Sequence, residues 1–200
     1  MITSSHNPDR FMSDLRLILS HGRKRLGLLI GAGAPFSIKV NPTTKELATD
    51  GEPLIPTVPA LTAAVVAALS AEDKAIVERI TAERGGKPNI EDILSRVRLL
   101  GRAIGTETVH GYDANHYETL GQSICNKIGQ LVGPLLPLEP NPYTELVAWI
   151  GGTSRESAVE IFTTNYDLLI EEALERARVP ILRRILWGTF ALLRSLKRSK

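Results

Sequence analysis

Two short hydrophobic segments, each running through a turn into a helix, constrain this sequence more than any other feature. Residues 26–33 read LGLLIGAG, and residues 158–167 read AVEIFTTNYD. A buried strand followed directly by a helix is the repeating unit of parallel α/β sheets. The sequence therefore predicts an α/β fold with a parallel sheet and helices on both of its faces. In such sheets a ligand binds beyond the carboxyl ends of the strands, where both turns fall.

The chain between these two strands has a mostly helical pattern. Apolar residues recur at helical spacing in five stretches, which read ALTAAVVAALS, AEDKAIVERITAER, NIEDILSRVRLLGRAI, HYETLGQSICNKIGQLV and NPYTELVAWIGG. We expect them to form a helical insertion over about residues 59–151, in which Asn89 caps the third helix. A first helix is expected between Asn7 and Gly22. Residues 36–58 are rich in proline and polar residues and are expected to form a long loop.

Charge and cysteine content narrow the expected partners and compartment. The formal net charge is +2, and the last twenty residues, ILRRILWGTFALLRSLKRSK, carry six basic residues and no acidic one. The rest of the chain therefore has a small acidic excess and no basic stripe, so nucleic acid is not an expected partner. The single cysteine, Cys125, cannot form an internal disulfide, and the first residues show no secretion signal. We expect a cytoplasmic protein.

The first turn contains Gly31 and Gly33 directly after the strand. Glycines at this position allow a tight turn and a close approach of backbone N–H groups to a phosphate. The complete dinucleotide fingerprint would place a third glycine at position 36, where this chain has Phe36, and no Gly-Lys-Ser/Thr follows as in a P-loop. Two interpretations remain open on these residues alone: a tight turn of an α/β fold, or a nucleotide-binding loop.

The second turn carries Thr164, Asn165 and Asp167 at the start of the expected helix YDLLIEEALERAR. Asn and Asp are favoured as caps of a helix N-terminus, which is one explanation for their presence. The other explanation is that their side chains face a ligand at the carboxyl edge of the sheet. An amide and a carboxylate together could hold a ribose and a carboxamide.

Taken together, the two turns resemble the paired motifs of the sirtuin NAD-binding domain, which stand here as Gly31-Ala32-Gly33-Ala34-Pro35 and Thr163-Thr164-Asn165-Tyr166-Asp167. With its tyrosine, the second motif resembles that of the bacterial sirtuin-like domains of anti-phage defence. Those domains cleave NAD to nicotinamide and an ADP-ribose product. Two further stretches, PTVPALTAAVV and PNIEDILSRV, resemble that subgroup. The resemblance covers about residues 25–178. It implies a Rossmann-like sheet with a helical insertion between the two ligand-binding strand ends.

The resemblance also implies a set of residues in contact with NAD. These are Gly31, Ala32, Gly33, Pro35, Thr164, Asn165 and Asp167. The residues of the glycine turn would meet the phosphates, and Asp167 would hold the nicotinamide carboxamide. Asn165 would be the catalytic residue, because it would contact the nicotinamide-side ribose and place the attacking water. The glycosidic bond breaks with positive charge on the sugar, so a site that fixes the leaving group and stabilises that charge accelerates the reaction.

Two departures separate this chain from the family pattern. Pro35 stands where the family usually has a serine, so a hydroxyl contact is lost. The family also has a catalytic histidine some tens of residues after its second motif. The histidines of this chain all precede that motif and are His6, His21, His110 and His116, which we expect at the surface or as caps. Apart from these departures, the cysteine pairs that bind zinc in the deacylase branch of the family are absent, so neither zinc nor deacylation is expected.

We therefore expect residues 1–180 to form an incomplete sirtuin-like domain, truncated before the histidine, and residues 181–200 to form a basic tail unlike the family. The expected function is NAD binding and, in the complete domain, NAD hydrolysis in anti-phage defence. Expected partners are a second copy of the chain or a defence protein such as an ATPase. A membrane is not an expected partner, although the tail also has the pattern of a basic amphipathic helix. The alternatives are a catalytically deficient module that binds NAD or ADP-ribose, and an interaction fragment that binds no nucleotide.

Overall fold

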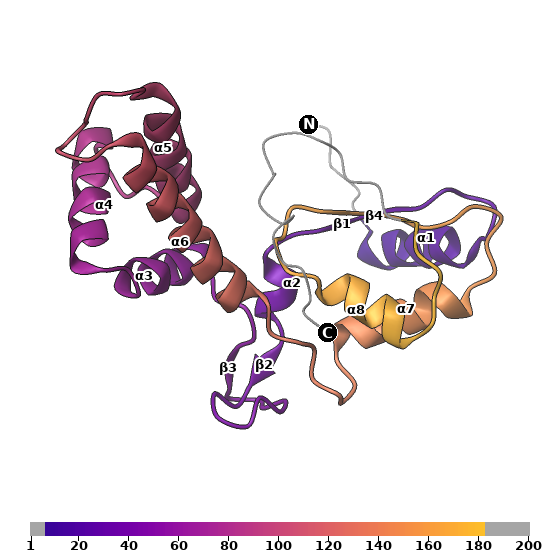
Figure 1. Ribbon diagram of the computed structural model, residues 1–200. Coiled ribbons are helices and arrows are strands. Elements are labelled where there is room, and N and C mark those ends of the chain that lie inside the picture. The colour runs from indigo at the N-terminus through magenta and orange to yellow at the C-terminus, as the bar shows by residue number, and fades with distance from the viewer. Residues whose placement is uncertain (1–6, 183–200) are drawn as a thin grey trace, which may run out of the picture.

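The structure is a computed structural model that describes residues 7–182 (Figure 1). His6 and the basic tail from residue 183 onward lie outside the described residues, and so does the amphipathic helix considered for that tail. The described chain has two regions, which Figure 1 shows side by side: an α/β region that contains two parallel strands, and a helical insertion. Within residues 7–182, no helix combines the length and the apolar character needed to cross a membrane.

The two predicted strands lie next to each other. They are β1 (Gly27–Ile30) and β4 (Glu160–Thr163), and they pair in parallel. Leu29 lies opposite Phe162 in this register. The α/β class and the parallel pairing of the two strands are therefore confirmed. In the described residues the parallel sheet has only these two strands, so a complete Rossmann-like sheet is not seen there.

Four helices of the described chain belong to the α/β region: α1 (Pro8–Ser20), α2 (Gly33–Phe36), α7 (Pro142–Gly152) and α8 (Leu169–Arg176). Helices α7 and α8 pack against each other below the strands in Figure 1, with apolar side chains such as Val147 and Leu169 buried. Helix α1 begins where the sequence predicts, because the side chain of Asn7 accepts hydrogen bonds from two backbone N–H groups of its first turn. None of the residues of α1 is buried.

The insertion consists of α3 (Val58–Ala67), α4 (Ala71–Arg84), α5 (Ile90–Ala103) and α6 (Ala114–Val132), as the helical periodicity predicts. Helices α5 and α6 pack along each other, and α3 contacts both. A continuous apolar core lies between the four helices. Its fully buried members include Val65, Ile76, Ile80, Ile93, Val97, Tyr117, Leu120 and Ile124. The predicted range 59–151 also contains α7, which packs against α8.

The stretch predicted as a long loop, residues 36–58, is mostly without regular structure, and it also contains a short antiparallel pair that was not predicted. Its strands are β2 (Lys39–Val40) and β3 (Glu52–Pro53). The backbone N–H of Leu54 donates to the carbonyl oxygen of Ile38 at 2.8 Å, and both side chains are buried. Burial of these apolar side chains attaches the segment to the core. The high proline content of the stretch gives no indication of this burial.

One face of the parallel pair is exposed to solvent. The side chains of Leu29 and Phe162, which lie opposite each other, are 77% and 51% exposed. Leu28 and Ile161 point to the other face, because side chains alternate along a strand, and they are half-buried. The sequence predicts helices on both faces, whereas the described residues leave the face with Leu29 and Phe162 uncovered.

Candidate functional site

The two sequence motifs meet at the carboxyl ends of the paired strands. The side-chain amide of Asn165 donates a hydrogen bond through Nδ2 to the carbonyl oxygen of Gly31 at 3.1 Å, although the two residues are 134 positions apart. The same carbonyl oxygen accepts from the backbone N–H of Ala34 at 3.0 Å. Parallel pairing of β1 and β4 places both strand ends at one edge, and the glycine turn and the second motif therefore form one site.

Side chains of the second motif close its turn onto the backbone. Thr163 Oγ1 accepts from the N–H of Asn165 at 3.0 Å, and Asp167 Oδ1 accepts from the N–H of Leu169 at 3.2 Å. Such local bonds compete with the helical pattern. Helix α8 consequently begins at Leu169 and not at Tyr166, where the sequence predicts its start. Asp167 therefore makes the cap-like bond that one interpretation of the sequence anticipates, and its second oxygen, Oδ2, is not used in that bond.

Asp167 is a buried carboxyl at this turn, with 7% of its surface exposed. Burial raises the pKa of the carboxyl above its ordinary value, and the nearby carboxylate of Glu171 raises the pKa further. Hydrogen bonds from the backbone N–H of Leu169 and from the side chain of Asn165 act in the opposite direction. An ionised Asp167 is thus held in an unfavourable environment, and a further hydrogen-bond donor would stabilise it.

The glycine turn leaves open space beside its backbone. Gly31, Ala32 and Gly33 are exposed, and a Cβ atom added at either glycine would meet no protein atom within 4 Å. Neither glycine has a positive φ angle, so the backbone conformation does not require glycine at these positions. The space is therefore available to a ligand that approaches the backbone. Pro35 is buried, so its ring packs inside the fold and does not share this open surface.

Two residues near the second motif, Glu91 and Tyr143, were not predicted from the sequence as part of the site. Tyr166 donates its hydroxyl hydrogen bond to the carboxylate of Glu91, in the first turn of α5, while Thr164 is exposed beside it. Burial raises the pKa of Tyr166, and so do the hydrogen bond to Glu91 and its negative charge. Glu91 belongs to the stretch PNIEDILSRV, so the signal that could have found it was its position in a motif of the insertion.

Tyr143, in the first turn of α7, is the second missed residue. It is 3% exposed, and its hydroxyl has no hydrogen-bond partner among the described residues. Burial raises the pKa of Tyr143, and the carboxylates of Asp167 and Glu171 add to that increase. Because the charge of Asp167 affects the pKa of Tyr143, this phenol lies near the site. No feature of the sequence around Tyr143 distinguishes it from a core tyrosine.

The histidines that the structure describes lie away from the two motifs. His21 is the C-cap of α1, and its ring contacts the backbone of that helix. In the insertion, His110 Nε2 lies 2.8 Å from Glu83 Oε1, and His116 Nε2 lies 3.4 Å from Asp73 Oδ1. His110 and His116 are each partly buried beside one carboxylate. The prediction that they lie at the surface or in caps is therefore not met. Across residues 7–182, no three side chains of the metal-binding types come together in one place.

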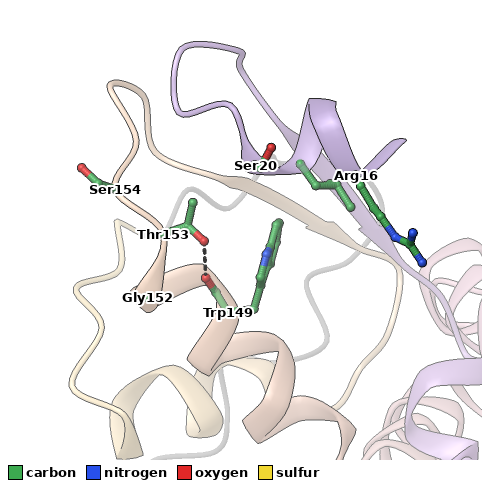
Figure 2. A pocket seen from close by; sticks show the side chains of 7 residues that line it. Arg16, Ser20, Trp149, Gly152, Thr153 and Ser154 are labelled. Carbon is green, nitrogen blue, oxygen red and sulfur yellow. Dashed lines mark hydrogen bonds between the residues drawn. The ribbon is translucent and has the colours of Figure 1, made fainter. Parts of the chain in front are cut away.

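The described cavities lie elsewhere. The larger, of 510 Å³, lies between the end of α1 and the end of α7 (Figure 2), where Arg16, Trp149 and Thr153 line it. Thr153 Oγ1 donates to the Trp149 carbonyl oxygen at 2.9 Å there. Beside this cavity the guanidinium of Arg155 lies 5.2 Å from the centre of the Trp149 ring and donates to the carbonyl oxygens of Leu19 and His21. No motif residue lines this cavity or the smaller one beside β2.

Comparisons of the chain with protein-family models and with curated proteins give no match.

Proposed function

We propose that the chain binds NAD at the site formed by the glycine turn and the second motif. The observation that carries this proposal is the hydrogen bond between Asn165 and the Gly31 carbonyl oxygen. It brings together the two turns that resemble the sirtuin motifs, at the strand ends where α/β sheets bind ligands. The open space beside Gly31 and Gly33 supports the proposal, because a ligand can reach the backbone there.

The hydrogen bonds of Asn165 suggest how it would act. One amide hydrogen goes to the Gly31 carbonyl oxygen, and the Asn165 side chain lies close enough to Asp167 to lower the pKa of that carboxyl. Its own carbonyl oxygen, Oδ1, then serves as an acceptor for a ribose hydroxyl or a water molecule. Asp167 is acceptor-only when ionised, so it suits the amide hydrogens of a nicotinamide carboxamide. Such a donor would stabilise a carboxylate that burial disfavours.

The reaction proposed for the domain is hydrolysis of the bond between ribose C1′ and the nicotinamide nitrogen. The nitrogen keeps the bonding electron pair and leaves as neutral nicotinamide. A water oxygen forms the new bond to C1′ and loses a proton, which yields ADP-ribose. Asn165 would orient that water, and Asp167 would hold the leaving group. His110 and His116 lie beside carboxylates elsewhere, and His21 contacts the backbone of α1, which favours a second candidate: a module that binds NAD or ADP-ribose without efficient cleavage.

The wider assignment follows from the same resemblance. We propose a sirtuin-like domain with a Rossmann-like sheet, acting in the cytoplasm in anti-phage defence, as a homo-oligomer or with a partner such as an ATPase. The parallel pairing of β1 with β4 and the four-helix insertion between them support the fold assignment. A contact between Thr164 and NAD is supported by the exposure of Thr164 at the site. A contact between Pro35 and NAD has no such support, since Pro35 is buried.

Calorimetry with NAD and ADP-ribose, together with an assay of nicotinamide release, tests the proposal. The wild-type chain is expected to bind NAD, and Asn165→Ala to weaken binding about tenfold through loss of its hydrogen bonds. Asn126→Ala is the matched control, because Asn126 is an exposed asparagine in α6 that makes one side-chain hydrogen bond. Absence of wild-type binding at millimolar NAD, or equal affinity in Asn165→Ala, would contradict the proposal. Nicotinamide release separates the hydrolase from the binding module.

A further inference from the structure

We infer that the hydrogen bond between Tyr166 and Glu91 positions the ligand-binding turn, so that the helical insertion holds Asn165 and Asp167 in place for the nucleotide. The ligand named in this inference rests on the function proposed above. Tyr166 and Glu91 are positioning residues in this account, because they act through their neighbours. The coupling itself is a property of the turn and can be measured without any ligand.

The geometry of three consecutive side chains supports the inference. Asn165 reaches the end of β1 at the Gly31 carbonyl oxygen. Tyr166 reaches the first turn of α5 at Glu91, and Asp167 reaches the start of α8 at the N–H of Leu169. The turn is therefore fixed to three different elements by adjacent residues. Of these three bonds, the one made by Tyr166 is the bond that leads to the insertion, from a residue 75 positions away.

The end of α5 that carries Glu91 is firmly held. Asn89 caps the helix, and its side chain accepts from the backbone N–H groups of Glu91 at 2.9 Å and Asp92 at 3.0 Å. The N–H of Ile90 donates to Thr62 Oγ1 of α3 at 3.0 Å, and the Ile90 side chain is 1% exposed. Any movement of Glu91 would thus require movement of a capped and buried helix end. This makes Glu91 a fixed point for the tyrosine.

The chemistry of the contact makes it suited to positioning. The Tyr166 hydroxyl donates to a side-chain oxygen on a fixed helix end, and a hydrogen bond depends on the direction of its donor. The ring of Tyr166 packs partly against the apolar core, while Glu91 is exposed. Packing restricts the ring, and the hydrogen bond selects its orientation. Apolar cover alone fixes this part of the molecule poorly, since the nearby strands expose Leu29 and Phe162.

The test uses three variants of the contact and one control. Tyr166→Phe and Glu91→Ala remove the hydrogen bond, whereas Glu91→Gln keeps an acceptor oxygen for the tyrosine and removes only the charge. Tyr117→Phe is the matched control, because its hydroxyl donates to the Val109 carbonyl oxygen at 3.2 Å within the insertion. We expect about a tenfold loss of NAD affinity in Tyr166→Phe and in Glu91→Ala. Glu91→Gln is expected to remain near wild type, and Tyr117→Phe to bind as wild type does.

Hydrogen exchange of the backbone amides of residues 163–169 gives a readout that needs no ligand. Exchange is expected to be faster in Tyr166→Phe and Glu91→Ala, and unchanged in Glu91→Gln and Tyr117→Phe. If the wild-type chain fails to bind NAD, the proposed function falls and the exchange rates still decide the inference. Unchanged exchange in Tyr166→Phe and Glu91→Ala overturns the inference, as does unchanged affinity in these variants of a chain that binds NAD. A Glu91→Gln variant that behaves like Glu91→Ala also overturns it.

Discussion

The helical insertion and the α/β region differ in how their residues are held. In the insertion, Val97, Tyr117 and Ile124 are completely buried between α3, α5 and α6. In the α/β region, the paired strands expose Leu29 and Phe162, and α1 buries no residue. Both proposed ligand-binding turns are in the less buried region. The comparison indicates that the insertion supplies most of the apolar stability, whereas the site depends on individual polar contacts.

Polar contacts of the α/β region connect side chains to backbone atoms across long sequence distances. Arg176, at the end of α8, donates to the carbonyl oxygens of Leu136 at 2.8 Å and Pro137 at 3.0 Å. Glu172 accepts from the N–H of Leu136 at 3.0 Å. These bonds attach the segment before α7 to α8, beside the apolar contact of the two helices. The ligand-binding turn is attached in the same manner, by single side chains.

The largest effect is expected where the two regions differ most in burial. Ile124→Ala in α6 removes a fully buried side chain and is expected to lower the free energy of unfolding by about 2–5 kcal/mol. Leu29→Ala in β1 removes a side chain that is 77% exposed, so it should change the free energy of unfolding by less than about 0.5 kcal/mol. Urea denaturation measures both. Equal losses in the two variants would remove the distinction between the regions.

A smaller effect separates two helix caps of similar geometry. Asn89 and Asn7 each accept two backbone N–H bonds, but α5 buries five residues and α1 buries none. Asn89→Ala is expected to lower the free energy of unfolding by about 1 kcal/mol. Asn7→Ala should leave the main unfolding transition unchanged and reduce only the helicity of α1. Denaturation followed by circular dichroism tests this, and a global loss in Asn7→Ala would show that α1 contributes to the core.

Substitution of Asp167, unlike the substitutions above, is expected to raise the free energy of unfolding at pH 7. Because burial raises its pKa in the folded state, the carboxyl contributes stability below its unfolded pKa of about 3.9, and the contribution is lost as the pH rises through the folded value. Asp167→Asn keeps an acceptor for the N–H of Leu169 and carries no charge. At pH 7 the variant should be more stable than wild type, and the difference should shrink at pH 4. Urea midpoints at the two pH values test the sign, and a less stable variant at pH 7 contradicts it.

The smallest stability change is expected at the glycine turn. Gly31→Ala and Gly152→Ala both place a methyl group in open space, so neither should lower the free energy of unfolding by more than about 0.5 kcal/mol. The proposed function predicts a difference in NAD affinity instead. Only Gly31→Ala should weaken binding, because its methyl group would occupy the space beside the ligand. Calorimetry on the two variants distinguishes a ligand surface from an ordinary turn, and equal affinities would favour the latter.

The sequence predicted those parts of the fold that local pattern determines. The two strands, the capped helices and the meeting of the two turns follow from short apolar runs and from the geometry of parallel pairing. The start of α8 was missed, because Asp167 bonds to the backbone and delays the helix. The contact of Tyr166 with Glu91 and the burial of Tyr143 near Asp167 depend on how distant helices pack, so local pattern alone does not predict them. The burial of Pro35 is likewise a property of the folded chain.

The contact between Arg155 and Trp149 gives the protein an optical property. The guanidinium beside the indole ring also donates to the carbonyl oxygens of Leu19 and His21 at the end of α1. Release of α1 would break these two bonds and leave the guanidinium free to move away from the ring, and greater exposure of the ring to water would shift tryptophan emission to longer wavelength. The chain has two tryptophans, and Trp187→Phe leaves Trp149 as the single emitter. The fluorescence of that variant would report in real time whether the N-terminal helix is attached.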